Sequence, residues 1–117
     1  MRRETLAEIV WAGSSQKDLR RFPNNVRALF GYSLFEMQQG LVPSSSHRPM
    51  SSIESGVYEL REQDSRAWYR VLYFIRIKGK IVVLHCFEKD TRKTERNDLD
   101  TATRRLKEVL TALRETK

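Results

Sequence analysis

The spacing of hydrophobic residues divides the chain into short strands and longer helices. An opening run, TLAEIVWAG at residues 5–13, has β-branched and aromatic residues and predicts a strand that ends at Gly13. Three more strands are predicted later in the chain, by GVYELRE (56–62), AWYRVLYFIRIK (67–78) and KIVVLHCFEK (80–89).

Three segments have helical spacing instead. SSQKDLRRF (14–22) predicts a short helix capped by Ser14 or Ser15. PNNVRALFGYSLFEMQQG (23–40) predicts a second helix with Pro23 in its first turn and Gly40 as its stop. Its expected buried stripe consists of Val26, Leu29, Phe30, Leu34 and Met37. Residues 94–117 predict an amphipathic helix with Thr94 as its cap and an apolar face of Leu99, Ala102, Leu106, Val109 or Leu110, and Leu113.

The order of these elements indicates the fold class. The Ser- and Pro-rich segment 41–56 is interpreted as a loop. The order is then β-α-α-β-β-β-α, which predicts an α+β domain with a mostly antiparallel sheet, a helical hairpin and a C-terminal helix. A chain of 117 residues fits one domain, residues 1–117.

Composition narrows the classes of function. The net charge of +7 favours a polyanion or an acidic protein as partner. No apolar run reaches the length of a membrane span and no cleavable leader is seen, so a cytoplasmic protein without membrane contact is expected. The single cysteine, Cys86, excludes an internal disulfide. With only two histidines as well, a zinc enzyme or a Ser/Cys hydrolase is disfavoured, and no cofactor is expected.

The tripeptide KGK at 78–80 predicts a two-residue hairpin turn, which fixes a strand register. In that register the apolar pairs are Ile75 with Val82, Tyr73 with Leu84 and Val71 with Cys86, so Cys86 is expected to be buried. The opposite face carries the pairs Phe74 with Val83, Leu72 with His85, Arg70 with Phe87, and Trp68 with Lys89.

The preceding strand extends this cationic face. Setting Arg61 opposite Arg70 aligns the apolar residues of the two strands, and a slip of one residue would not. Arg61, Arg70 and Lys89 then lie on one side of three adjacent strands. They would form either an anion-binding concavity or structural ion pairs with Glu59, Glu62 or Glu88.

The ordered set GVYELR, YRVLYF, IVVLHCFEKDTRKT and ATRRLKE resembles the RelE superfamily of toxins, in particular its phage-related HigB-like branch. The resemblance implies a RelE-like fold and a toxin that cleaves messenger RNA on the ribosome. It also implies a helix-turn-helix antitoxin as partner. Arg61, Arg70 and Lys89 match the basic strand positions of the family, and Arg92 and Lys93 belong to its basic segment before the last helix. The chain departs from the pattern at Asp90, where a second lysine is usual, and at Glu95, where a proline is usual.

These positions suggest roles in RNA cleavage. Arg61 and Arg70 would bind phosphate oxygens, and Lys89 would bind phosphate or, with a lowered pKa, transfer a proton. Trp68 and Phe87 would stack on an unpaired base or simply pack at the edge of the core, with Arg92 and Lys93 binding RNA. His85 is expected to be a packed neutral histidine and His47 an exposed one. Asp90 is either a turn residue or a general base.

Two other functions remain open from the sequence. One is a ParE-like toxin that acts on DNA gyrase through protein contacts. The other is a nucleic-acid-binding module without catalysis, whose binding would depend steeply on salt.

Overall fold

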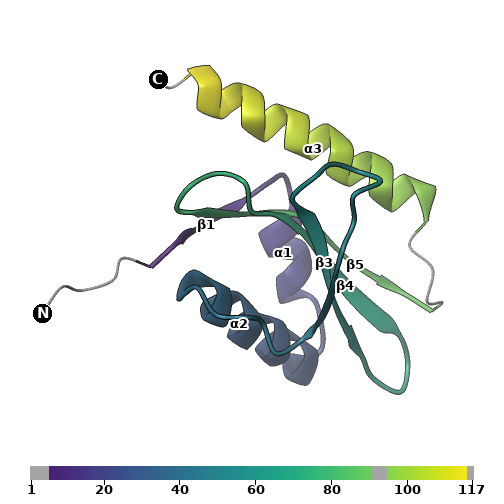
Figure 1. Cartoon of the computed structure of the whole chain (residues 1–117). Coiled ribbons are helices and arrows are strands. Elements are labelled where there is room, and N and C mark those ends of the chain that lie inside the picture. The colour runs from purple at the N-terminus through teal and green to yellow at the C-terminus, as the bar shows by residue number, and fades with distance from the viewer. Residues whose placement is uncertain (1–5, 91–94, 116–117) are drawn as a thin grey trace, which may run out of the picture.

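A five-stranded sheet forms the centre of the molecule (Figure 1). The structure, a computed structural model, describes residues 6–90 and 95–115. The strands are β1 (Glu8–Trp11), β2 (Ser46–Pro49), β3 (Val57–Gln63), β4 (Trp68–Phe74) and β5 (Lys80–Lys89), in the spatial order β1-β5-β4-β3-β2. β1 is parallel to β5, and the other pairs are antiparallel.

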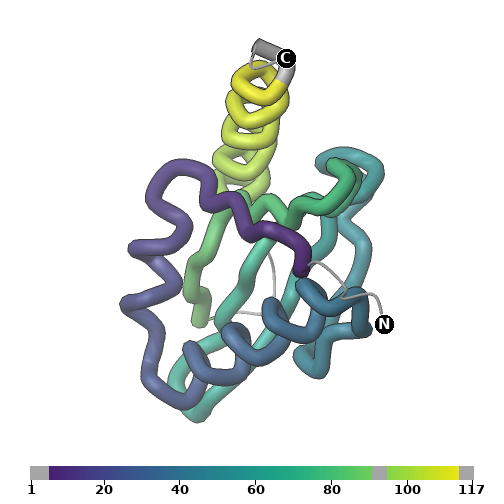
Figure 2. The backbone as a smooth tube through the Cα atoms, turned by 90° about the vertical axis from the view of Figure 1, so that its left-hand side faces the viewer, coloured from purple at the N-terminus to yellow at the C-terminus, as the bar shows by residue number. Residues whose placement is uncertain are grey.

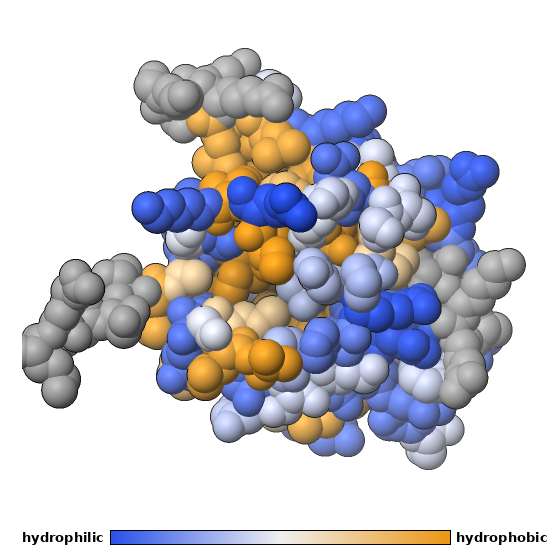
Figure 3. Space-filling model, in the orientation of Figure 1, coloured by the Kyte–Doolittle hydropathy of each residue, from blue (hydrophilic) through white to orange (hydrophobic). Residues whose placement is uncertain are grey.

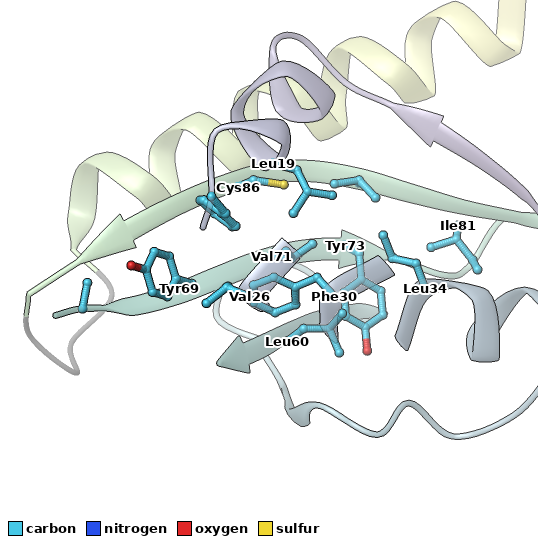
Figure 4. Close-up of a cluster of buried hydrophobic side chains, with 13 residues drawn as sticks. Leu19, Val26, Phe30, Leu34, Leu60, Tyr69, Val71, Tyr73, Ile81 and Cys86 are labelled. Carbon is cyan, nitrogen blue, oxygen red and sulfur yellow. The ribbon is translucent and has the colours of Figure 1, made fainter. Parts of the chain in front are cut away.

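Helices cover both faces of this sheet. α1 (Ser15–Arg20) and α2 (Asn24–Gln38) pack on one face, and α3 (Arg96–Glu115) crosses the other (Figures 1 and 2). The core under α1 and α2 includes Leu19, Val26, Phe30, Leu60, Tyr69, Val71, Tyr73 and Cys86 (Figure 4). The core under α3 includes Leu72, Phe74, Val82, Leu84, Ala102 and Leu106. The predicted α+β class with a mostly antiparallel sheet is confirmed, and so is the burial of Cys86, whose thiol pKa is raised by that burial.

The prediction that residues 41–56 form only a loop is wrong. They contain the edge strand β2, which pairs with β3 from Ser46 opposite Arg61 to Pro49 opposite Tyr58. All four residues of β2 are exposed, so no apolar alternation marks this strand in the sequence. The segment is anchored by Ser45, whose hydroxyl accepts from Ser33 Oγ at 2.8 Å and donates to Glu62 Oε2 at 2.6 Å.

The predicted register is confirmed for β3 and β4, where Arg61 lies opposite Arg70. For β4 and β5 it holds from Trp68 opposite Lys89 to Leu72 opposite His85. Beyond that point it is wrong, because a bulge shifts Tyr73 to Val83 and Phe74 to Val82. As a result, Val82 and Leu84 lie under α3 instead of on the face of Cys86. Both faces of β5 are buried, so its sequence has no alternation that could reveal the bulge.

Two details of the predicted helices also differ. Leu29 does not join the buried stripe of α2, because 48% of its surface is exposed. Pro23 is the N-cap of α2 rather than a residue of its first turn. The predicted cap of α3, Thr94, lies outside the described residues.

Candidate functional site

One buried carboxylate gathers three arginines from three neighbouring strands. Glu59 of β3 lies 3.1 Å through Oε1 from Arg48 Nε of β2 and 3.8 Å from Arg61 Nε of β3. Its other oxygen lies 3.6 Å from Arg70 Nε of β4. Alternation along β3 places Glu59 and Arg61 on the same face, and the register sets Arg61 opposite Arg70. We call these four residues the arginine cluster; it lies on the α3 side of the sheet.

Arg70 forms the floor of this cluster rather than its surface. Its side chain is fully buried, and none of its three guanidinium nitrogens has a hydrogen-bond partner among the described residues. Burial lowers the pKa of Arg70, and the Glu59 carboxylate acts in the opposite direction. An arginine in a protein remains charged even so, so Arg70 contributes a buried positive charge.

Arg61 and Arg48 are the accessible cations of the cluster. The Arg48 side chain is 48% exposed and that of Arg61 is 20% exposed. The Arg61 guanidinium lies over the Trp68 ring, 4.9 Å from its centroid, which fixes its orientation by a cation–π contact. Figure 3 shows hydrophilic side chains gathered over β3 and β4. An anion that approached this surface would meet Arg61 and Arg48 before the buried Arg70.

Lys89 lies at the end of β5 and is held by the start of α3. Its Nζ lies 2.8 Å from Glu95 Oε1 and 3.0 Å from Asp98 Oδ2. Hydrogen bonds to Glu95 and then Asp98 raise the pKa of Lys89. The expected lowered pKa of Lys89 is therefore wrong, and both a phosphate contact and proton transfer stay predictions for this residue.

Asp98 is a site residue that sequence reasoning missed. Its Oδ1 lies 2.9 Å from His85 Nε2, while its Oδ2 faces Lys89, so one carboxylate joins two strand residues to α3. In the sequence, Asp98 is recognisable only as an acidic residue in the first turn of an amphipathic helix. That position does not indicate which side chains it contacts. His85 stacks on Phe87 with ring centroids 4.6 Å apart, and burial lowers its pKa despite Asp98. This matches the expected packed neutral histidine.

The remaining predicted RNA contacts differ in their accessibility. Trp68 is partly exposed, whereas Phe87 is only 8% exposed and is covered by His85 on one side. Phe87 therefore packs in the core under α3. Arg92 and Lys93 lie outside the described residues. Asp90 is exposed and lines a polar hollow of about 690 Å³ with Arg21 and Arg66.

Two classes of feature are not found within the described ranges. In residues 6–90 and 95–115, no group of three or more His, Cys, Asp or Glu side chains is placed to hold a metal ion. Among the helices of the same residues, none is long and apolar enough to span a membrane.

Comparison with known families matches a model of phage-derived Gp49-like proteins to residues 17–107, most of this chain. The chain belongs to the Gp49-like family. The match runs from α1 into α3 and so includes the arginine cluster, Lys89 and Asp98. No curated protein matches this Gp49-like chain significantly.

Solved structures share the fold of this Gp49-like protein. An arginine-to-alanine double mutant of the E. coli toxin RelE, in its free state, is 18% identical with a TM-score of 0.57, covering 89% of this chain and 98% of that one. The Mycobacterium tuberculosis toxin–antitoxin complex RelBE2 is also 18% identical, with a TM-score of 0.52, covering 76% of this chain and 98% of that one. The predicted RelE-type fold and phage-related family are confirmed.

Proposed function

We propose that this chain is the toxin of a RelE-type toxin–antitoxin module and inhibits translation by cleaving messenger RNA on the ribosome. The solved relatives are described as toxins, one of them in a toxin–antitoxin complex. An adjacent helix-turn-helix antitoxin would be the partner of this chain in the cytoplasm.

The observation that carries this proposal is the arginine cluster beside Lys89. Arg48, Arg61 and Arg70 surround a single carboxylate, so the cluster has two positive charges in excess. The buried Arg61 Nε and all three Arg70 nitrogens have no hydrogen-bond partner in the described part of the chain. Unsatisfied buried donors are costly, and at Arg61, whose side chain is partly exposed, a phosphate oxygen is the kind of acceptor that guanidinium groups bind best.

Cleavage by attack of a ribose 2′-hydroxyl creates extra negative charge on the phosphorus oxygens. In our proposal Arg61 contacts this charge directly, and Arg48 and Lys89 bind the phosphates on either side. Trp68, which is partly exposed, holds the Arg61 guanidinium in place and stacks on a base. Arg70 is fully buried and pairs with Glu59, so it keeps Glu59 and Arg61 in position without contacting RNA itself. It is therefore a positioning residue in our proposal. Arg92 and Lys93 extend the RNA path, and Asp90 and His85 stay candidates for proton transfer.

A translation reaction with purified ribosomes and a defined messenger RNA tests this function. The wild-type chain should cut the RNA only when ribosomes are present. Arg61→Ala should cut about a hundredfold more slowly, which is the usual cost of losing one preorganised charge contact in a transition state. Arg76→Ala is the matched control, because it removes an exposed arginine outside the cluster.

Other outcomes would point to the rival functions. Equal loss of cleavage in Arg61→Ala and Arg76→Ala would rule out the arginine cluster as the active site. Gyrase-trapped DNA breaks without RNA cleavage would favour a ParE-like toxin. RNA or DNA binding without cleavage of either would favour a non-catalytic binding module.

A further inference from the structure

α2 has apolar residues on both of its sides. Its inner side contributes Val26, Phe30 and Leu34 to the core. Its outer side exposes Leu29 by 48%, Tyr32 by 60% and Phe35 by 48%. A helix on the surface of a soluble protein normally has polar residues on the side that faces water. The outer side of α2 therefore has the composition of a contact surface.

This outer side is also free of charge over two turns. Residues 28–35 read ALFGYSLF and contain no charged side chain. Ala28, Tyr32 and Phe35 lie on one side at helical spacing, and all three are exposed. Gly31 is next to them, and a Cβ atom added there would meet no described atom within 4 Å. We call Ala28, Leu29, Gly31, Tyr32 and Phe35 the outer face of α2.

No described element covers the outer face of α2. Figure 2 shows α2 along the near side of the molecule, with no other part of the described chain in front of it. The chain that follows α2 binds its flank instead, where the Ser44 backbone N–H and hydroxyl donate to the two oxygens of Glu36 at 2.7 and 2.8 Å. The exposed residues Leu41 (56%) and Val42 (72%) line a hollow with Met37 and Tyr58 that includes none of the outer-face residues. An exposed group of apolar side chains such as the outer face of α2 marks a protein-binding site.

The charges near the outer face of α2 indicate the chemistry of a partner that would bind there. Arg20, Arg21 and Arg27 are exposed at the N-terminal end of α2, and the whole chain has a net charge of +7. Two copies of this chain would bring like charges together, whereas an acidic partner would be attracted. Ala28 and Gly31, which precede the exposed Tyr32 and Phe35, have little or no side chain, so the backbone of another helix could approach α2 closely there.

We propose that the outer face of α2 binds an amphipathic helix of the antitoxin, with an apolar stripe on Tyr32 and Phe35 and acidic residues near Arg27. This inference rests on the proposed function for the existence of an antitoxin, and adds where it binds. α2 and the arginine cluster lie on opposite faces of the sheet. The antitoxin helix thus docks on the toxin without covering the RNA-binding cations.

The test co-expresses this chain with the protein encoded by the adjoining gene and measures both binding and growth arrest. Tyr32→Glu and Phe35→Glu place a negative charge on the outer face of α2. Each should weaken the complex at least thirtyfold, as expected for a central aromatic contact. Each variant should still arrest growth and cut RNA at the wild-type rate, so its toxicity should escape neutralisation. Thr111→Glu adds the same charge to an exposed position of α3 and should stay neutralised.

The possible outcomes separate this inference from the proposed function. Full neutralisation of both variants would overturn the docking site. Growth arrest by the wild type without a complex with the neighbouring protein would overturn the partner assignment, and a wild-type dimer that either variant breaks would show a second copy as the occupant. A wild type that neither arrests growth nor cuts RNA would overturn the proposed function itself. Tyr32→Ala, which adds no charge, is the second variant if either glutamate variant is unstable.

Discussion

At the scale of single residues, the arginine cluster depends on one carboxylate. Replacing Glu59 by glutamine leaves three guanidinium groups around a neutral side chain, one of them fully buried. Removing one partner from a buried ion pair usually costs 3–5 kcal/mol, so Glu59→Gln should lower the free energy of unfolding by about 3 kcal/mol. Urea denaturation measures this change.

The control and an anion test make the Glu59 prediction specific. Glu54→Gln removes an exposed carboxylate and should change stability by less than about 0.5 kcal/mol. Added phosphate should recover more stability in Glu59→Gln than in the wild type, because the anion can replace the missing charge. Equal stability of the two glutamine variants would show that Glu59 is not the counter-charge of the arginines.

A second prediction at the scale of single residues concerns His85 and the pH dependence of the folding stability. Burial lowers its pKa in the folded protein below the ordinary value of about 6.5, despite the nearby Asp98. Between the folded and unfolded pKa values the unfolded chain binds more protons. The stability linked to His85 is therefore complete above about pH 6.5 and is lost as the pH falls toward the folded pKa.

The variant His85→Gln should show a smaller loss of stability between pH 7.5 and 5.5 than the wild type. His47→Gln, which changes an exposed histidine, is the matched control and should keep the wild-type slope. Unfolding free energies at several pH values give the comparison. An unchanged slope in His85→Gln would mean that other groups cause the acid sensitivity.

At the scale of elements, the docking of α3 depends on Arg105. Its Nη1 donates to the Leu84 carbonyl at 3.0 Å and its Nη2 to Ser14 Oγ at 3.1 Å, so it ties α3 to β5 and to the turn after β1. The guanidinium lies against Gly13, where an added Cβ would come within 2.5 Å of Arg105 Nε. Gly13 also has a φ of +52°, which a side chain disfavours.

Gly13→Ala should therefore destabilise the fold more than Gly40→Ala. Gly40 also has a positive φ, +81°, but a Cβ there would meet nothing within 4 Å among the described residues. The free energy of unfolding should fall by about 1 kcal/mol in both variants, because alanine disfavours a positive φ. In Gly13→Ala it should fall by about 1–3 kcal/mol more, because the new Cβ displaces Arg105. Melting temperatures rank the two. Equal effects would show that Arg105 moves aside without cost.

How far the sequence predicts these elements depends on the contrast between buried and exposed faces. The register of β3 against β4 was predictable because Leu60 and Val71 must share one apolar face with Tyr58 and Tyr73. The bulge at Leu72 and Tyr73 was not, because both faces of β5 are buried. β2 was missed for the opposite reason, since its residues are all exposed.

The sequence likewise predicted which residues of the candidate site meet, but not how deeply each side chain is buried. The register brings Arg61, Arg70 and Trp68 together as expected, but it does not reveal how deep each side chain lies. The burial of Arg70 depends on which elements cover that part of the sheet. Asp98 depends on the tertiary position of α3, which no spacing along the chain specifies.

At the scale of the whole molecule, the two faces of the sheet have separate tasks in our proposals. The α3 side carries the arginine cluster and Lys89, and the opposite side carries α2 with its apolar outer face. Attraction of RNA to a chain with a net charge of +7 is long-range, so every cation contributes something to the rate of encounter. Only cations that touch phosphate release counterions when RNA binds. The salt dependence of affinity can therefore distinguish a contact residue from a buried positioning residue.

For a single-stranded RNA, each phosphate contact contributes about −0.7 to the slope of log affinity against log salt concentration. Arg61→Gln should therefore reduce the steepness of this slope by about 0.7, because the Arg61 side chain is partly exposed at the surface of the cluster. Arg70→Met should weaken binding with little change in slope, since Arg70 is fully buried and acts through Glu59 and Arg61. Fluorescence anisotropy of a labelled RNA at several salt concentrations measures both quantities. If Arg70→Met flattens the slope as much as Arg61→Gln does, the Arg70 guanidinium reaches RNA directly, and the cluster must open when the substrate binds.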